Sequence, residues 1–204
     1  MLVSFDCYGT LVDWKKSIGD FLHYHFGGNE IVRSFFNCEY STIGKGYRRY
    51  KEILAECLRV ASGVKDSRLE MALILSFAKS PPFPDVYYGL LLLKERGYKL
   101  AIISNTDKDL IKITLAGFEE IFDYIITAED TKYYKPNPLA FKTAYELMKV
   151  KHEEVVHVSA YPEYDLEAVS SLGIKNVMID RYGYNWKPKV KDMVELARFI
   201  EYIR

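Results

Sequence analysis

Several polar side chains stand at points where a short apolar run of the sequence ends. Asp6 ends such a run near the N-terminus, Ser104 ends the run 99–104, and Ser159 ends the run 154–159. Short apolar runs of this length predict buried strands, and ligands of open α/β sheets bind beyond the carboxyl ends of the strands. We therefore expect these side chains to meet at one edge of a sheet.

Asp6 has the chemistry of a nucleophile. With a reference pKa near 3.9, an ordinary aspartate is ionised at neutral pH, so it can attack a substrate without a base to activate it. Gly9, three residues later, lets the chain leave the strand by a tight turn. The alternative interpretation is that Asp6 only caps this turn, and this stretch alone does not decide between the two.

Two charged residues farther along the chain fit the same edge. Lys135 precedes a proline at the start of a predicted helix, and Asp165 follows Ser159 by six residues. A strand-end serine is commonly a helix cap and a lysine is usually solvated, so neither type indicates a site by itself. Their order along the chain, after Asp6 and Ser104, is what indicates a common site.

The elements that would position these residues alternate between helix and strand from residue 85 onward. Residues 14–79 show helical patterns and no strand pattern, and a helix at 85–96 then opens a series of strand and helix units. Repeated units of this kind predict an α/β fold, in which helices cover both faces of a parallel sheet. After the first strand, the predicted strands are 99–104, 124–127, 154–159 and 176–179, and the helices between and after them are 107–116, 138–148, 163–172 and 192–203.

This pattern divides the chain into a discontinuous core domain and an insertion. Residues 1–13 and 81–204 form the α/β core domain, and residues 14–80 form a helical cap domain between them. Insertions placed directly after a strand that carries a functional residue usually cover the site. We expect the cap to lie over Asp6.

Together, these residues and their order resemble the motifs of the haloacid dehalogenase superfamily, over essentially the whole chain. The resemblance implies a Rossmann-like parallel sheet with helices on both faces and an inserted, mobile helical cap. It also implies a hydrolase whose four motif residues are the nucleophile Asp6, then Ser104, Lys135 and the carboxylate Asp165.

Two departures separate this sequence from the phosphatases of that superfamily. Phosphatases carry Asp-x-Asp at the first motif, where the second aspartate protonates the leaving alcohol, but this sequence has Tyr8 there. Loss of such an acid typically costs roughly 10²- to 10⁴-fold in rate. The first carboxylate of the fourth motif is replaced by Ala160, which removes an oxygen ligand that magnesium prefers. Only Asp6 and Asp165 would then remain to hold the ion.

The first motif, Phe-Asp-Cys-Tyr-Gly-Thr-Leu-Val-Asp-Trp, closely resembles that of the L-2-haloacid dehalogenases, whose reaction needs neither a leaving-group acid nor a metal. This resemblance implies that Asp6 attacks the halogen-bearing carbon of a small 2-halocarboxylic acid, forming an aspartyl ester that water hydrolyses. Lys135 would keep Asp6 ionised. Ser159 and Asp165 would hold the lysine and orient the water, and no cofactor is expected.

Other residues are expected to contact the small anionic substrate. Thr10, Ser104 and Asn105 would position the nucleophile and bind the substrate carboxylate, and Tyr8 would line the substrate site. The dehalogenases also place a cap arginine over the halide. The candidates, which spacing does not separate, are Arg33, Arg48 and Arg49.

Three further positions bear on this interpretation. An asparagine of the dehalogenases is replaced by Tyr161, in a loop that is one residue longer, and a tyrosine is replaced by Phe141. His157, in the middle of a predicted strand, is expected to be a core histidine rather than a catalyst.

Composition narrows the function classes. The 204-residue chain has a formal net charge of zero, which argues against a nucleic-acid or acidic-membrane surface. No leader pattern precedes the first strand and no apolar run reaches roughly 18 residues, so we expect a cytoplasmic protein without a membrane span. The absence of glutamine beside abundant Lys, Glu and Tyr is compatible with a thermophile. An aromatic-rich cap is compatible with a homodimer.

Two smaller expectations concern cysteines and lysines. The three cysteines lack the paired spacing of a disulfide framework or a zinc site, so Cys7 and Cys57 are expected to be packed thiols. The basic run of Lys187, Lys189 and Lys191 is expected to be a solvated loop.

The sequence thus favours a hydrolase of 2-halocarboxylic acids over two alternatives. One is a magnesium-dependent phosphatase whose leaving-group acid comes from elsewhere. The other is a degenerate member that binds a small anion without turnover, for which the tyrosine at position 161 is the motivation.

Overall fold

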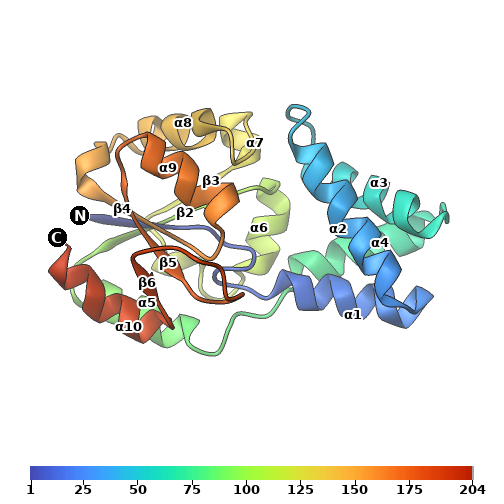
Figure 1. Cartoon of the computed structure of the whole chain (residues 1–204), viewed down its shortest axis with the longest axis horizontal. Helices are drawn as coiled ribbons and strands as arrows, with labels where there is room; N and C mark the ends of the chain where they lie inside the picture. The colour runs from blue at the N-terminus through green and yellow to red at the C-terminus, as the bar shows by residue number, and fades with distance from the viewer. Residues whose placement is uncertain (204) are drawn as a thin grey trace.

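The computed structural model describes residues 1–203 and has three layers, with helices on both faces of a parallel sheet (Figure 1). Within these residues the sheet has six strands in the order β3-β2-β1-β4-β5-β6. Their bounds are β1 (Leu2–Phe5), β2 (Lys99–Ser104), β3 (Tyr124–Thr127), β4 (Val155–Ser159), β5 (Lys175–Ile179) and β6 (Lys189–Val190). The predicted fold class is confirmed.

Helices lie on either side of this sheet. One face carries α7 (Ala128–Thr131), α8 (Pro138–Met148) and α9 (Glu167–Ser171), and the other carries α5 (Val86–Glu95) and α10 (Met193–Phe199) (Figure 1). Because both faces are covered, the strands are nearly continuous apolar runs. In β1, Val3 and Phe5 belong to the larger hydrophobic core. Leu2 belongs to a second core on the other face, with Ala101 of β2 and Phe141 of α8.

The strand order places Asp6 at the switch point of the sheet. The chain runs outward from β1 through β2 to β3, and then returns to β4 on the other side of β1. Phe5 is aligned with Ile102 on one side and with Val158 on the other. The Asp6 backbone N–H donates to the Val158 carbonyl at 3.0 Å. Ligands of α/β sheets bind in the crevice at such a reversal.

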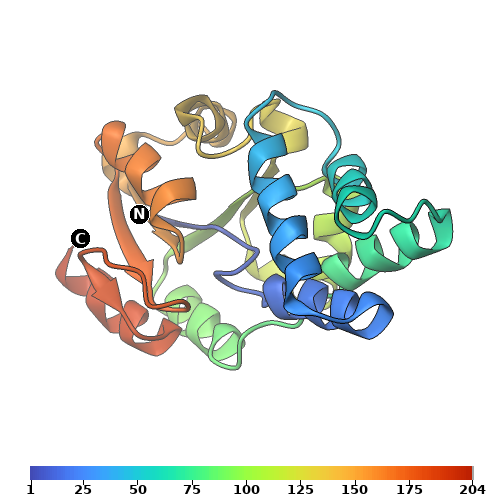
Figure 2. The ribbon, with the colours of Figure 1, turned by 45° about the vertical axis from the view of Figure 1, so that its right-hand side comes forward.

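Four consecutive helices between β1 and α5 lie together beside this edge of the sheet (Figures 1 and 2). They are α1 (Trp14–Phe26), α2 (Asn29–Ile43), α3 (Tyr50–Ser62) and α4 (Ser67–Ala78), and α4 contacts α6 (Lys108–Thr114) of the core. We call these four helices the cap. That residues 14–80 form a separate domain, with 1–13 and 81–204 as the other, stays a prediction.

Two elements differ from expectation in shape. The predicted helix 163–172 begins as a π-helical turn over Pro162–Leu166 and only then continues as α9. The backbone of Lys189 pairs with β5 in the short edge strand β6, whereas Lys187 and Lys191 lie in irregular chain on either side, and all three lysines are exposed as predicted. Among residues 1–203, every helix is too short or too polar to cross a membrane.

The cysteine prediction is wrong at one position. Cys38 of α2 and Cys57 of α3 form a disulfide, with their Cα atoms 5.5 Å apart. The spacing along the chain gave no sign of it, because the two residues meet only when the two helices pack against each other. Cys7 is a buried thiol, as predicted.

Candidate active site

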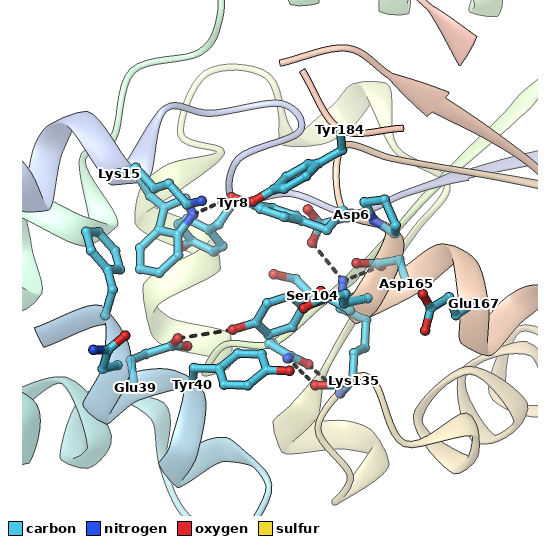
Figure 3. Close-up of a pocket in the computed structure, with 18 of the residues that line it drawn as sticks. Asp6, Tyr8, Lys15, Glu39, Tyr40, Ser104, Lys135, Asp165, Glu167 and Tyr184 are labelled. Atoms are coloured by element: carbon cyan, nitrogen blue, oxygen red, sulfur yellow. Dashed lines mark hydrogen bonds and ion pairs between the residues drawn. The ribbon is translucent and has the colours of Figure 1, made fainter. Parts of the chain in front are cut away.

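A cavity of about 680 Å³ lies between the carboxyl ends of the strands and the cap (Figure 3). The core contributes Asp6, Ser104, Lys135 and Asp165 to its lining, and the cap contributes Arg33 and Glu39. Residues that stand far apart in the sequence, and that were expected to meet at one edge of the sheet, are therefore brought together.

The Lys135 ammonium lies at the centre of the core side of this cavity. It donates to Asp6 Oδ1 at 2.7 Å, to Asp165 Oδ1 at 2.7 Å and to the Ile103 carbonyl at 3.0 Å. All three donors of the ammonium are thus used. Asn105 fixes the lysine backbone from both sides, since its Oδ1 accepts from Lys135 N at 2.8 Å and its Nδ2 donates to Lys135 O at 2.9 Å.

The Asp6 carboxylate is held at both oxygens. Oδ1 accepts from Lys135, and Oδ2 accepts from the Thr10 hydroxyl at 2.7 Å, which itself accepts from the Ala160 backbone N–H at 3.0 Å. Gly9, with φ at 94°, makes the turn that brings Thr10 back to Asp6. Thr10 is fully buried, so it positions the carboxylate rather than facing the cavity.

Burial and charge act in opposite directions on this group. Burial raises the pKa of Asp6, the negative charge of Asp165 adds to the rise, and the Lys135 ammonium opposes it. For Asp165, the ammonium and a hydrogen bond from His157 overcome burial and hold the pKa of that carboxyl below its usual value. Although burial opposes it, the two carboxylates raise the pKa of Lys135.

His157 contacts this site, although the sequence indicated only a core histidine. Its Nε2 lies 3.0 Å from Asp165 Oδ1 and its Nδ1 lies 2.9 Å from the Ser4 hydroxyl, which in turn lies 2.8 Å from the Tyr145 hydroxyl. A histidine with its proton on Nε2 satisfies every contact: Tyr145 donates to Ser4, Ser4 to Nδ1, and Nε2 to Asp165. His157 is buried as predicted, and it also orients Asp165.

The loop after β4, which the sequence resemblance predicts to be one residue longer, forms a π-helical turn. Such turns are frequent at functional sites. Asp165, the fourth residue of the turn, points into the cavity (Figure 3). Asp165 Oδ2 is buried and accepts no hydrogen bond from any residue within 1–203. Ser159 Oγ accepts from the Tyr161 N–H at 3.0 Å and shapes this turn, and no bond joins it to Lys135 in the described chain.

The candidates for substrate contact fall into two groups. Ser104 lines the cavity, and its hydroxyl has no hydrogen-bond partner within residues 1–203. Arg33 also lines the cavity from α2. Arg48 does not, because it pairs with Glu56 at 2.7 Å within the cap, and Arg49 is an exposed residue directly before α3.

Tyr8 presents its ring to the cavity but not its proton. Its hydroxyl lies 2.5 Å from Thr114 Oγ1, and Thr114 donates to the Ala78 carbonyl at 2.8 Å. Because the Thr114 hydroxyl hydrogen is used in this way, the Tyr8 hydroxyl donates its hydrogen bond to Thr114 Oγ1. The Tyr8 ring stacks on Phe77, with centroids 4.0 Å apart, and burial raises the pKa of Tyr8 well above its usual value. Tyr8 is thus a poor proton donor for a leaving group.

The ring of Tyr161 packs against the turn at Gly9 that follows Asp6. Its phenol accepts a hydrogen bond from Trp14 Nε1 at 3.2 Å. It also lies where a Cβ on Gly9 would stand, only 2.0 Å from that position, so Gly9 is required there. At position 161, where the resemblance implies an asparagine, the chain thus has a tyrosine ring packed against Gly9.

Glu39 is a functional candidate that sequence reasoning missed. It is 4% exposed on α2, accepts from the Tyr50 hydroxyl at 3.0 Å and from the Tyr164 hydroxyl at 3.4 Å, and lines the cavity. Burial raises the pKa of Glu39 to about 7. Its position four residues after Phe35, on the buried face of the helix, was the available signal.

The donor set does not fit a magnesium site. Asp6 and Asp165 both bind the Lys135 ammonium, and Ala160 offers no side-chain oxygen. Magnesium requires near-octahedral oxygen ligands. Within residues 1–203 no cluster of three or more His, Cys, Asp or Glu residues is arranged to hold a metal.

Comparison with known proteins gives a consistent result. The family model of the haloacid dehalogenase-like hydrolases matches residues 1–173. Haloacetate dehalogenase H-2 of Moraxella sp. (strain B) is 28% identical over 89% of this chain and 86% of its own length. The structure of the L-2-haloacid dehalogenase of Xanthobacter autotrophicus with chloropropionic acid covalently bound has a TM-score of 0.87 at 20% identity, covering 100% and 99% of the two chains. That likeness supports the fold.

A phosphatase is also among the similar proteins. Glyceraldehyde 3-phosphate phosphatase of Methanothermobacter thermautotrophicus is 31% identical, over 52% of this chain and 48% of its own length.

Replacement of Lys135 by Met should destabilise the protein strongly. It would leave two carboxylates buried and unpaired, which typically costs about 3–5 kcal/mol of unfolding free energy. The loss should shrink at pH 5, because protonation neutralises the carboxylates. Urea unfolding at pH 7 and pH 5 measures both effects. Lys108→Met is the control, since Lys108 pairs with Asp130 at the surface, and it should cost less than about 1 kcal/mol. An equal, small loss in both variants would contradict the arrangement.

Replacement of Glu39 by Gln should change how stability depends on pH. The folded pKa of Glu39 is about 7, against an ordinary 4.5. Between these values the folded state holds more protons than the unfolded state, so stability is full below pH 4.5 and falls as pH rises through 7. The difference between the folded and the ordinary pKa of Glu39 corresponds to about 3 kcal/mol of unfolding free energy. The wild type should therefore lose about that much more stability than Glu39→Gln between pH 4.5 and pH 8.5, as measured by denaturant unfolding. Parallel profiles would show that Glu39 titrates normally.

Proposed function

The chain belongs to the haloacid dehalogenase-like hydrolases, and from this premise we propose that it hydrolyses the carbon–halogen bond of 2-halocarboxylic acids. The observation that supports this most strongly is the state of Tyr8. Its proton is held by Thr114 beside the nucleophile, where a phosphate-ester hydrolase would need a free acid. A halide leaves as an anion and needs no proton. The Moraxella relative, which spans most of the chain, is a haloacetate dehalogenase.

The first step would be an in-line displacement by Asp6. A carboxylate oxygen forms a bond to C2 of the substrate while the carbon–halogen bond breaks, and the halide departs with the bonding electrons. The product is an ester of Asp6, which carries no charge. Lys135 and Thr10 would hold the carboxylate in one orientation, so little reorganisation is needed before attack.

The second step would be hydrolysis of that ester. Water attacks the Asp6 carbonyl carbon, and Asp165 Oδ2 would accept its proton. As the carbon–oxygen bond of the tetrahedral intermediate breaks, Asp165 would return this proton to the departing alkoxide, which leaves as a 2-hydroxy acid. The Asp6 carboxyl group would lose the remaining proton to solvent and become a carboxylate again. Asp165 suits this role because one oxygen is fixed by Lys135 and His157 while the other has no partner within residues 1–203.

The substrate carboxylate would be bound by Ser104 and Arg33. Ser104 lines the cavity at the carboxyl end of β2, with a hydroxyl that has no partner within residues 1–203, and Arg33 lines the cavity from α2. A donor on the core and a cation on the cap would fix the substrate between them. Asn105 would act through Lys135 rather than on the substrate, because its side chain bonds the lysine backbone.

The phosphatase alternative has one supporting observation, the partial similarity to a glyceraldehyde 3-phosphate phosphatase. It would require a proton donor other than Tyr8.

Three other expectations stay predictions of the sequence: a cytoplasmic location, a thermophilic source and a homodimer. The proposed ligand is a small carboxylic acid.

The proposed activity is tested by halide release from 2-chloropropionate in the presence of a metal chelator. Wild-type protein should release chloride, and Asp6→Asn should reduce the rate at least 10³-fold because the nucleophile is lost. A phosphate-ester assay with magnesium serves as the comparison. Turnover of the phosphate ester that the chelator abolishes, without any halide release, would overturn the proposal in favour of the phosphatase.

The ester intermediate is tested by a single turnover in H₂¹⁸O with enzyme in excess. Because water attacks the Asp6 carbonyl, the first product molecule should carry an unlabelled oxygen from Asp6, and the label should appear in the peptide that contains Asp6. Mass spectrometry of product and peptide measures both. Label in the first product would mean that water attacks the substrate directly.

A further inference from the structure

The cap wall of the cavity combines aromatic rings with one buried carboxyl group. Trp14, Phe36, Tyr40 and Tyr50 line this wall together with Glu39. Trp14 and Phe36 meet edge to face, with ring centroids 5.1 Å apart. In Figure 3, Glu39 and Tyr40 lie on the cap side, opposite Asp6, Lys135 and Asp165. The cavity thus has a reacting end and a remote end of different chemistry.

Glu39 is buried, and the positive charge of Lys15 acts on it without forming an ion pair, opposing the rise of its pKa by burial. In the described chain it accepts hydrogen bonds from two phenols, on Tyr50 and Tyr164, and makes no ion pair. A carboxylate can accept about four hydrogen bonds, so part of its capacity is unused. The half-buried Lys15 instead places its ammonium over the rings of Tyr161 and Tyr182, 5.0 and 4.4 Å from their centroids. The ammonium of this cap lysine is thus already held on aromatic rings of the core rather than on Glu39.

The cavity is also large for a haloacetate or a chloropropionate. Its volume is about 680 Å³. If each heavy atom occupies at most the roughly 30 Å³ that a water molecule takes in the liquid, a six-atom acid fills less than about 200 Å³. A substrate held at the reacting end would leave the remote end, with Glu39, to be filled by another part of the same molecule.

We propose that the substrate is a 2-halo acid that carries an alkylammonium group at the end remote from the halogen, and that Glu39 determines this specificity. The proposal rests on the proposed function and deepens it. The carboxylate of such a substrate would reach Ser104 and Arg33, and its cation would lie against Glu39 and the rings of Tyr40 and Tyr50.

The chemistry of the wall favours a cation over the alternatives. A neutral alkyl tail would complete the burial of Glu39 without offering it a positive charge or a hydrogen-bond donor, which is unfavourable. An anionic tail would be repelled. An ammonium group gains from the carboxylate and from the negative faces of the rings, and aromatic surfaces that enclose cationic nitrogen are a recurrent recognition device.

A matched pair of substrates tests the proposal without any variant. These are 2-chloro-4-(trimethylammonio)butanoate and 2-chloro-5,5-dimethylhexanoate, which have the same shape and differ only in the charge of the terminal group. Neither carries a nucleophile that could displace chloride by itself. We expect kcat/KM for chloride release to be at least tenfold higher for the cation. Equal values, or a preference for the neutral compound, would overturn the proposal.

Two variants assign the preference to Glu39. Glu39→Gln keeps the shape of the side chain and removes its charge, and it should bring the ratio of kcat/KM between the two substrates close to one. Glu52→Gln removes an exposed acid from α3, away from the cavity, and should leave the ratio as in the wild type. A ratio that survives Glu39→Gln would show that another group selects the cation.

A failure of the cation site can be distinguished from a failure of the proposed dehalogenase function. If 2-chloropropionate and both test compounds release no chloride, the dehalogenase proposal fails. Binding of the halogen-free pair, 4-(trimethylammonio)butanoate and 5,5-dimethylhexanoate, is then measured by calorimetry. Tighter binding of the cation that Glu39→Gln abolishes would support the cation site, and equal binding would refute it.

Discussion

The arrangement of the core depends on one buried ammonium group that is shared by two buried carboxylates. Each charge alone would cost several kcal/mol to remove from water, and the cost is offset only when geometry and hydrogen bonds are nearly complete. Here Lys135 uses all three of its donors on Asp6, Asp165 and the Ile103 carbonyl. The ends of β1 and β2, the π-helical turn after β4 and the loop before α8 are therefore tied to one another, since each contributes a group to this centre.

The same centre explains why two similar carboxylates can take different roles. Asp6 and Asp165 share the ammonium, but burial raises the pKa of Asp6, whereas the contacts of Asp165 with Lys135 and His157 lower its pKa. In the proposed reaction, formation of the ester would remove the less well stabilised of the two buried negative charges. Asp165 and Lys135 would then remain as a neutral pair, with Asp165 Oδ2 unpartnered within residues 1–203.

The sequence allowed the sheet and the reacting end to be predicted, because their signals are local. Apolar runs end at Asp6, Ser104 and Ser159, and parallel strands bring such ends to one edge. The contact of His157 with Asp165 and the Cys38–Cys57 disulfide arise only from packing between elements, so no local pattern contains them. Glu39 was marked only by its place on the buried face of its helix. The resemblance predicted a longer loop after β4, but not its shape as a π-helical turn, which keeps Asp165 directed at Lys135.

That turn also connects the two ends of the cavity. Tyr164 donates to Glu39 of the cap, and the next residue, Asp165, accepts from Lys135 of the core. A change in the position of the cap relative to the sheet must therefore act on the backbone that carries Asp165. A ligand that engages Glu39 would hold α2 against this turn at the moment when Asp165 has to orient water. In the proposed reaction, recognition of the remote end of a substrate and hydrolysis at its reacting end would be coupled through two adjacent side chains, Tyr164 and Asp165.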